Sequence, residues 1–152
     1  MLNTGLSEWG NRYINLAKEI STWSKDPSRK IGAVAVGEKG QILAQGYNGF
    51  PRGILDSADR YNDRPLKYRL VVHAEMNVIY NATYNGVSLD GARLFVYGLP
   101  VCSECAKGII QVGIKSVTIY TDDIVPDMWT ESYELTNNMF NEAGVSCLWI
   151  QS

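Results

Sequence analysis

The sequence predicts one three-layer α/β domain whose sheet is opened by an antiparallel hairpin. Two β-prone segments, residues 31–36 and 41–46, flank a short turn and predict that hairpin. From residue 73 onward, helical and strand-like segments alternate; helices of about 10–15 residues between strands indicate crossover connections in a largely parallel sheet covered on both faces. With 152 residues and no linker or internal repeat, residues 1–152 are expected to form one domain.

An amphipathic helix precedes the hairpin. Ser7 or Thr4 can cap its start, and Pro27 lies just beyond its end. Its apolar positions follow the helical period: Leu6, Trp9, Tyr13, Leu16, Ala17, Ile20 and Trp23. After the hairpin, residues 47–72 are polar and contain the breakers Asn48-Gly49, Pro51-Arg52-Gly53 and Asp63-Arg64-Pro65, so we expect a long irregular loop, which is often functional.

The second half of the chain supplies the crossover units. We expect helices at residues 73–84, 102–112 and 128–143, and strands at residues 94–97, 117–120 and 145–150. A strand-like end at residues 70–72 precedes the first of these helices, and Gly113 and Gly144 follow the other two.

Composition and charge exclude several classes of protein. An apolar content of 45% excludes extended disorder, and the net charge of −2 predicts no general attraction to nucleic acid or to a membrane. No apolar run is long enough to cross a membrane, and the start of the chain lacks a signal peptide pattern. We therefore expect a cytoplasmic protein, in the host cytoplasm if it is viral.

The chain has three cysteines and one histidine, an odd thiol number that argues against a disulfide framework. Cys102 and Cys105 share one face of a first helical turn, where the helix dipole stabilises thiolates, the form that binds Zn²⁺. A pair of buried structural thiols and a thioredoxin-like redox pair are the alternatives to a zinc site for these two cysteines. Cys147 alternates with apolar residues in the last strand and is expected to be an inert core thiol, which leaves one zinc site.

The triplet His73-Ala74-Glu75 opens another helix. Positions i and i+2 can serve one site only at a helix end, although a structural histidine and a capping glutamate would give the same pattern. Together, His73, Cys102 and Cys105 form a catalytic zinc set with a fourth position left for water. Glu75 then fits a general base better than a fourth ligand.

The motifs His73-Ala74-Glu75 and PVCSEC at residues 100–105 resemble the zinc-dependent cytidine/deoxycytidylate deaminase superfamily. Four longer segments look like its deoxycytidylate (dCMP) deaminase branch: residues 25–33 (KDPSRKIGA), 46–53 (GYNGFPRG), 73–77 (HAEMN) and 105–115 (CAKGIIQVGIK). The family usually has proline directly before the first cysteine, whereas here Val101 lies between Pro100 and Cys102. The ligand spacing is unaffected by this departure.

The resemblance implies a cytidine deaminase-like αβα fold with a mixed five-stranded sheet, and a hydrolase that converts dCMP to dUMP and ammonia for thymidylate synthesis. Glu75 would move protons from the activated water to N3 of the ring and to the leaving ammonia. One catalytic Zn²⁺ per subunit, a homohexamer, activation by dCTP and inhibition by dTTP are also implied, with Mg²⁺ accompanying the triphosphate. By resemblance, Asn48, Gly49, Phe50 and Arg52 contact the effector.

Substrate contacts are expected from several segments. Asn48 is by resemblance a sugar or base contact, although an ordinary turn asparagine is the alternative. Lys25, Ser28 and Arg29 offer charge and hydroxyl donors for the 5′-phosphate, although solvated loop charges are the alternative. Tyr120 lies at a strand end and could contact the pyrimidine, although a core tyrosine is the alternative. The candidate substrate-binding residues are Asn48, Ala74, Lys25, Ser28, Arg29 and Tyr120.

Other functions fit parts of the same pattern. The zinc residues are shared with deaminases of other cytosine nucleosides or nucleotides and of tRNA bases, although an RNA editor would be expected to carry basic clusters. A zinc-stabilised nucleotide-binding module is a non-enzyme alternative that the presence of Glu75 disfavours, and a thiol oxidoreductase is another. Trp129, Tyr133 and Trp149 are candidates for subunit contacts.

Overall fold

A computed structural model describes residues 1–122 and 124–152. The elements follow in the order α1 (Glu8–Ser21), β1 (Gly32–Val36), β2 (Ile42–Tyr47), α2 (Ala58–Asn62), α3 (Arg64–Leu70), α4 (Ala74–Tyr84), β3 (Arg93–Tyr97), α5 (Ser103–Gln111), β4 (Ser116–Thr121), α6 (Asp127–Ala143) and β5 (Ser146–Gln151). Apart from the strand-like end expected at residues 70–72, each predicted helix and strand is present, and its ends lie within two residues of those expected.

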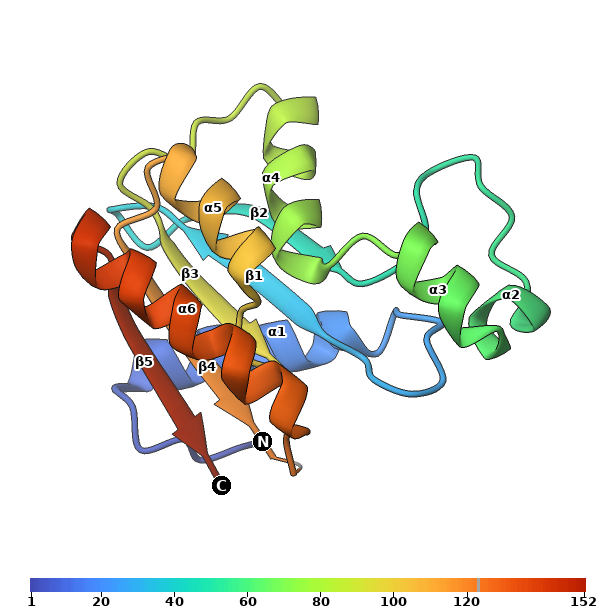
Figure 1. The fold of residues 1–152 in the computed structure, drawn as a ribbon. Coiled ribbons are helices and arrows are strands. Elements are labelled where there is room, and N and C mark those ends of the chain that lie inside the picture. Colours follow the sequence, from blue (N-terminus) through green and yellow to red (C-terminus); the bar gives the residue numbers. More distant parts are fainter. Residues whose placement is uncertain (123) are drawn as a thin grey trace.

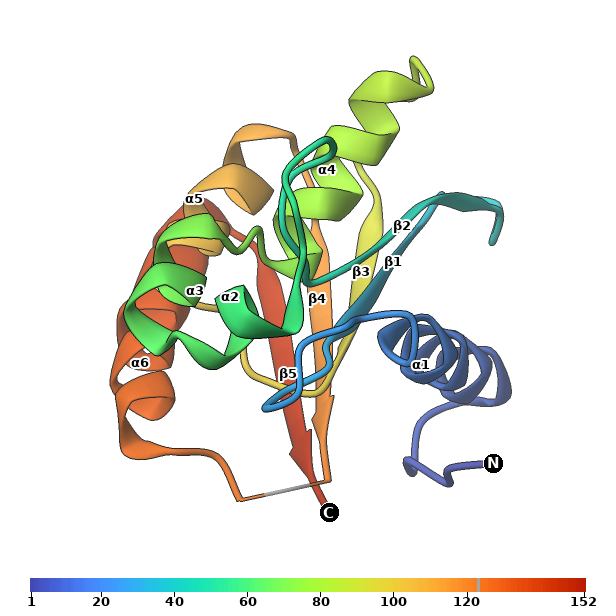
Figure 2. The same cartoon turned by 90° about the vertical axis from the view of Figure 1, so that its right-hand side faces the viewer.

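The strands form one five-stranded mixed sheet in the order β2-β1-β3-β4-β5. β1 runs antiparallel to both β2 and β3, whereas β3, β4 and β5 are parallel to one another. The predicted hairpin and crossovers are therefore confirmed. Seen along the sheet edge, α1 lies on one face and α4, α5 and α6 lie on the other (Figure 2). Among the described residues, no helix is both long and apolar enough to cross a membrane.

Two buried clusters hold these layers together. One lies between the sheet and α4–α6 and includes Val96 and Ile119, and the other lies between the sheet and α1 and includes Ile14 and Phe95. Alternating strand residues supply the two clusters because successive side chains point to opposite faces of a sheet.

A close contact between β2 and α4 determines where α4 begins. A Cβ atom at Gly46 would lie 2.6 Å from the backbone nitrogen of Val78 and 2.7 Å from the carbonyl oxygen of Ala74, so only glycine fits there. The side-chain amide of Asn77 also donates to the carbonyl of Tyr47 at 2.7 Å. These contacts hold the first turn of α4, and with it the triplet at residues 73–75, against the sheet.

The prediction of an irregular loop over residues 47–72 was wrong in its second half. Asp63 caps α3 by accepting a hydrogen bond from Leu66 N, and Pro65 lies in the first turn, where its missing N–H costs nothing. Pro65, which the sequence pattern predicts to interrupt regular structure, thus lies in the first turn of a helix. Leu70 ends α3 instead of a strand, and Val72 makes a single antiparallel bridge with Gly49. The segment with α2 and α3 projects from the main body (Figure 1).

Candidate active site

Two helix N-termini bring the three soft ligands together. His73 is the N-cap of α4 and Cys102 the N-cap of α5, and both have extended backbone dihedrals. At a cap, side chains can reach across the helix axis instead of pointing outward. His73 Nδ1 lies 3.3 Å from Cys102 Sγ and 3.4 Å from Cys105 Sγ. The three donor atoms all lie within 4.8 Å of one another.

This donor set fits a tetrahedral zinc ion. Zn–S bonds of about 2.3 Å and Zn–N bonds of about 2.0 Å place N and S ligands roughly 3.6 Å apart. The separations of 3.3 and 3.4 Å are close to that value. The hydrogen bond from Cys105 lowers the pKa of Cys102 to about 4 and raises that of Cys105, so one sulfur is readily ionised. A divalent cation would stabilise both as thiolates.

Glu75 is the second residue of α4 and lies beside this group. Its side chain is buried, and burial raises its pKa to about 7, with the nearby Cys102 sulfur adding to the effect and His73 opposing it. A carboxyl group with a pKa near neutrality can both accept and donate a proton. The position therefore suits a proton carrier.

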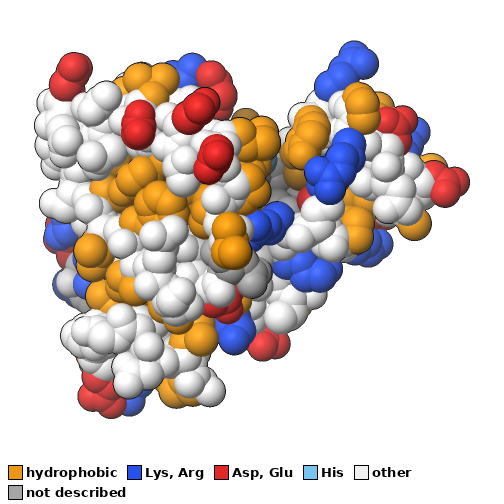
Figure 3. Space-filling view, turned by 60° about the horizontal axis from the view of Figure 1, so that its bottom comes forward, with side chains coloured by type: hydrophobic (Ala, Val, Ile, Leu, Met, Phe, Trp, Pro, Cys, Tyr) orange, Lys and Arg blue, Asp and Glu red, His pale blue; other side chains and the backbone are white. Residues whose placement is uncertain are grey.

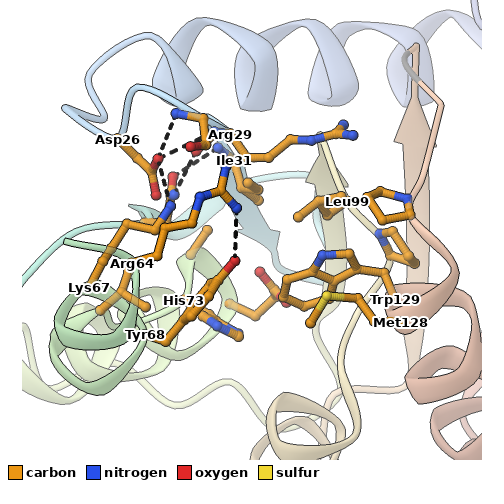
Figure 4. A pocket seen from close by; sticks show the side chains of 17 residues that line it. Asp26, Arg29, Ile31, Arg64, Lys67, Tyr68, His73, Leu99, Met128 and Trp129 are labelled. Carbon is orange, nitrogen blue, oxygen red and sulfur yellow. Dashed lines mark hydrogen bonds and ion pairs between the residues drawn. The ribbon is translucent and has the colours of Figure 1, made fainter. Parts of the chain in front are cut away.

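A cavity of about 450 Å³ is lined by His73 of the donor cluster and by Glu75. Its wall near His73 is apolar and includes Leu99, Met128 and Trp129, and the ring centroids of His73 and Trp129 are 5.9 Å apart. The charged side chains of Asp26, Arg64 and Lys67 occupy the opposite end, whereas the Arg29 guanidinium extends toward the Leu99 side and donates to the carbonyl oxygen of Ile124 at 2.6 Å (Figure 4). The cavity thus joins a reactive end to a basic end.

The basic end is built from two segments far apart in sequence. Arg29 and Ser28 come from the loop after α1, whereas Arg64 and Lys67 come from α3, whose sequence has three basic residues and no acidic one. Lys and Arg side chains gather along the hollow between the main body and the projecting segment (Figure 3). The sequence pattern predicts an irregular loop here, so α3 and its cavity residues were not predicted. The three basic residues of α3 were the available signal for a basic site.

Asn48 lies at the floor of the cavity and is buried. Its Oδ1 accepts from Ile31 N at 2.8 Å, and its Nδ2 donates to the carbonyl oxygen of Arg29 at 2.9 Å. The side chain therefore holds the loop that carries Ser28 and Arg29. Ala74 also lines the cavity.

Two predicted substrate residues do not line the cavity. Lys25 is exposed and pairs with Asp56, its Nζ 3.0 Å from Oδ2. Tyr120 is buried on the α1 face of the sheet and stacks with Tyr97, whereas the cavity lies on the other face. Strand alternation directs Ile119, and not Tyr120, toward the helices that carry the metal ligands. The structure therefore corrects the assignment of Tyr120 to the pyrimidine.

A second cavity of about 410 Å³ lies on the other side of residues 49–52. Three of the predicted effector residues, Gly49, Phe50 and Arg52, line it, but Asn48 belongs to the first cavity. Arg52 Nη2 donates to Asn81 Oδ1 at 2.6 Å, and its guanidinium lies 5.4 Å from the ring centroid of Tyr84.

The remaining aromatic and thiol candidates are partly buried. Trp129 belongs to the cavity wall, and Tyr133 and Trp149 pack against the main core with an edge-on contact at 4.8 Å. Cys147 also packs against that core, and its Sγ lies 3.4 Å from the hydroxyl of Tyr133. Cys147 is therefore not part of the donor cluster of His73, Cys102 and Cys105.

Comparison with known proteins agrees with this geometry. Residues 7–121 match the family model of the cytidine and deoxycytidylate deaminase zinc-binding region. The chain is 37% identical over 147 residues to an uncharacterized deaminase from the luxG 3′ region of Aliivibrio fischeri, covering 95% of each protein. It is 36% identical over 146 residues to the deoxycytidylate deaminase of Homo sapiens, covering 91% of this chain and 78% of the human protein.

Solved structures show the same arrangement of elements. The dCMP deaminase of cyanophage S-TIM5 in its apo form superposes with a TM-score of 0.74 at 26% identity, covering 95% of this chain and 99% of that one. The same phage protein in complex with dCMP and dUMP gives a TM-score of 0.72 at 25% identity, covering 95% of this chain and 98% of that one.

Proposed function

The chain belongs to the cytidine and deoxycytidylate deaminase family, and on that basis we propose that it hydrolyses dCMP to dUMP and ammonia. One observation carries the proposal: a single cavity is lined by His73 of the donor cluster and by Glu75, and also by the basic side chains of Arg29, Arg64 and Lys67. A nucleoside monophosphate has matching ends, a base to be attacked and a phosphate to be held. The phage relative crystallised with dCMP and dUMP supports this choice of substrate.

Bound to His73, Cys102 and Cys105, Zn²⁺ would supply a Lewis acid that lowers the pKa of a water molecule. The chain's own part in the reaction is proton transfer. Glu75 accepts a proton from the attacking water and delivers it to N3 as the C4–O bond forms. It then carries the second proton to the amino group, which leaves as ammonia when the C4–N bond breaks.

The basic end of the cavity selects a nucleotide over a nucleoside. Arg29 and Arg64 offer guanidinium donors suited to a phosphate, and Lys67 adds a buried ammonium group. The apolar wall of Leu99 and Trp129 suits the face of a pyrimidine.

A turnover assay with zinc content measured on the same sample tests the proposal. We expect dCMP to be converted with about one zinc per chain, and deoxycytidine, dCTP and tRNA to be converted much more slowly. Rapid turnover of tRNA or deoxycytidine with inert dCMP would support the alternative deaminases instead. A zinc-loaded chain that converts none of these would point to a binding module.

We also propose regulation through the second cavity, with dCTP as activator and dTTP as inhibitor. The guanidinium of Arg52 and the aromatic rings of Phe50 and Tyr80 offer donors and stacking surfaces for a nucleotide. Among the described residues that line this cavity there is no carboxylate, so Mg²⁺ would arrive with the triphosphate. Rates at subsaturating dCMP that ignore both triphosphates, with and without Mg²⁺, would refute regulation.

The oligomeric state and the cellular location are the last parts of the proposal. A homohexamer in the cytoplasm would supply dUMP for thymidylate synthesis. Exposed Tyr80 and Tyr84 on α4 provide apolar surface near the second cavity for subunit contacts. Mass photometry would show a single hexameric species, and a monomer at micromolar concentration would contradict the assembly.

A further inference from the structure

Two hydroxyl groups of α6 hold the peptide groups on both sides of Cys102. Thr136 Oγ1 donates to the carbonyl oxygen of Val101 at 2.9 Å, and Ser132 Oγ accepts from Ser103 N at the same distance. Ser132 and Thr136 are four residues apart, so they lie on the same face of α6. That helix packs against α5 but contributes none of the three clustered metal donors. Figure 1 shows the two helices side by side.

The two contacts satisfy one fully buried backbone carbonyl and the first N–H of α5. Val101 and Thr136 are each 0% exposed, so neither the carbonyl nor the hydroxyl can turn to water. Ser103 is the first residue of α5, where an N–H has no acceptor within its own helix. The Cys102 sulfur accepts from Cys105 N at 3.4 Å, whereas Ser103 N has the Ser132 hydroxyl as its acceptor. Buried polar groups rarely go unpaired, so these hydroxyls restrain the backbone.

The same contacts hold the segment in which Val101 lies between Pro100 and Cys102. The Val101 side chain is buried in the main core, and its carbonyl has the partner supplied by Thr136. Cys102 then follows in extended conformation as the N-cap of α5, with its sulfur 3.3 Å from His73 Nδ1. The residue that separates the proline from the cysteine is thus held by the Thr136 hydroxyl of α6.

We propose that Ser132 and Thr136 are positioning residues for the metal site. They hold the backbone around Cys102 so that its sulfur and that of Cys105 face His73 before the metal binds. The inference rests on the zinc site of the proposed function and not on the identity of the substrate. Loss of a partner that hydrogen-bonds a ligating side chain typically weakens metal binding by about 10- to 100-fold, and we expect the lower end of that range here because these hydroxyls act through the neighbouring peptide groups.

Competition with a chromophoric chelator measures this effect without reference to catalysis. We expect Thr136→Val and Ser132→Ala each to weaken zinc binding by about tenfold or more. Thr136→Ser keeps the hydroxyl and should restore most of the affinity. Thr130→Val is the matched control, because the Thr130 hydroxyl bonds to Asp127 O within α6 and is expected to leave zinc affinity unchanged.

A purely structural role predicts a different result. In that case Thr136→Val would lower the stability of the metal-free and zinc-loaded chains equally, with zinc affinity within twofold of wild type, and the inference would be wrong. Should Thr136→Val fail to fold, Ser132→Ala decides the question, since Ser132 is only partly buried. A wild-type chain that binds zinc but leaves dCMP unchanged would contradict the proposed function, and the variants' zinc affinities would still decide the positioning role.

Discussion

Lys67 and Asp26 form an ion pair inside the protein, with Nζ 3.3 Å from Oδ1 and each side chain 5% exposed. Lys67 belongs to α3 and Asp26 to the loop after α1, so the pair joins the projecting segment to the main body at the basic end of the cavity (Figure 4). The same Asp26 oxygen accepts hydrogen bonds from Ser28 N and Arg29 N. The Asp26 carboxylate therefore orients both α3 and the loop that carries Ser28 and Arg29.

Removing one partner of this pair should destabilise the fold. We expect Lys67→Met to lower the free energy of unfolding by about 3 kcal/mol, because it leaves the Asp26 carboxylate buried without a counter-charge. The double variant Asp26→Asn/Lys67→Met removes both charges and should recover part of the loss. Urea unfolding measures both, and equal stability of Lys67→Met and wild type would show that the pair contributes little.

Substitution of the proton carrier should separate chemistry from metal binding. Glu75→Gln keeps the size of the side chain but removes its ability to move protons, so we expect turnover of dCMP to fall by at least about 100-fold. Zinc content should stay at the wild-type value, because Glu75 is not one of the three clustered donors. A variant with near-native turnover would remove Glu75 from the reaction.

Loss of a sulfur ligand should reduce metal binding. We expect Cys102→Ser or Cys105→Ser to lose most bound zinc and all measurable dCMP turnover, since both sulfurs lie within 3.4 Å of His73 Nδ1. Cys147→Ser is the matched control, because Cys147 packs against Tyr133 away from the cluster. Elemental analysis of purified variants provides the measurement, and full zinc content in both ligand variants would contradict the assignment.

Chelation should destabilise the wild-type chain as well as inactivate it. A metal that binds only the folded state adds stability that depends on its concentration, so we expect the melting temperature to fall when zinc is removed. Added Zn²⁺ should restore both the melting temperature and the turnover of dCMP. A chelated chain that melts at the original temperature would indicate that the site holds no tightly bound metal.

Two arginines of α3 provide a matched test of phosphate recognition. Arg64 lines the cavity, whereas Arg69 of the same helix is exposed and does not. We expect Arg64→Gln to raise the KM for dCMP by about tenfold, because a charge-assisted hydrogen bond to the phosphate is lost, and Arg69→Gln to have no effect. Turnover of deoxycytidine, which has no phosphate, should not change in either variant. Equal effects on both substrates would place Arg64 outside the phosphate site.

Local patterns in the sequence predicted much of this protein. Hydrophobic periodicity located six helices and strands of the second half to within two residues, because each period reflects the geometry of one element. The spacing of His73, Glu75, Cys102 and Cys105 indicated a metal site with a nearby carboxylate. That worked because each pair lies in a single helical turn, whose geometry is independent of the rest of the fold.

The prediction failed where local signals were ambiguous. Pro65 breaks a helix at most positions but begins one when it lies in the first turn behind a capping aspartate, so α3 was not foreseen. Tyr120 was placed at the correct sheet edge but on the wrong face, since one residue along a strand reverses the direction of a side chain.

The sequence by itself determined the order of the five strands and of α1, α4, α5 and α6, the donor types and the position of Glu75, since these depend on neighbours in the chain. Only the tertiary structure decided that Arg64 and Lys67 share a cavity with His73, or that Ser132 and Thr136 hold the backbone around Cys102. These residues are brought together by packing of α3 and α6 against segments distant in sequence. Long-range packing of this kind leaves no periodic signal in the chain.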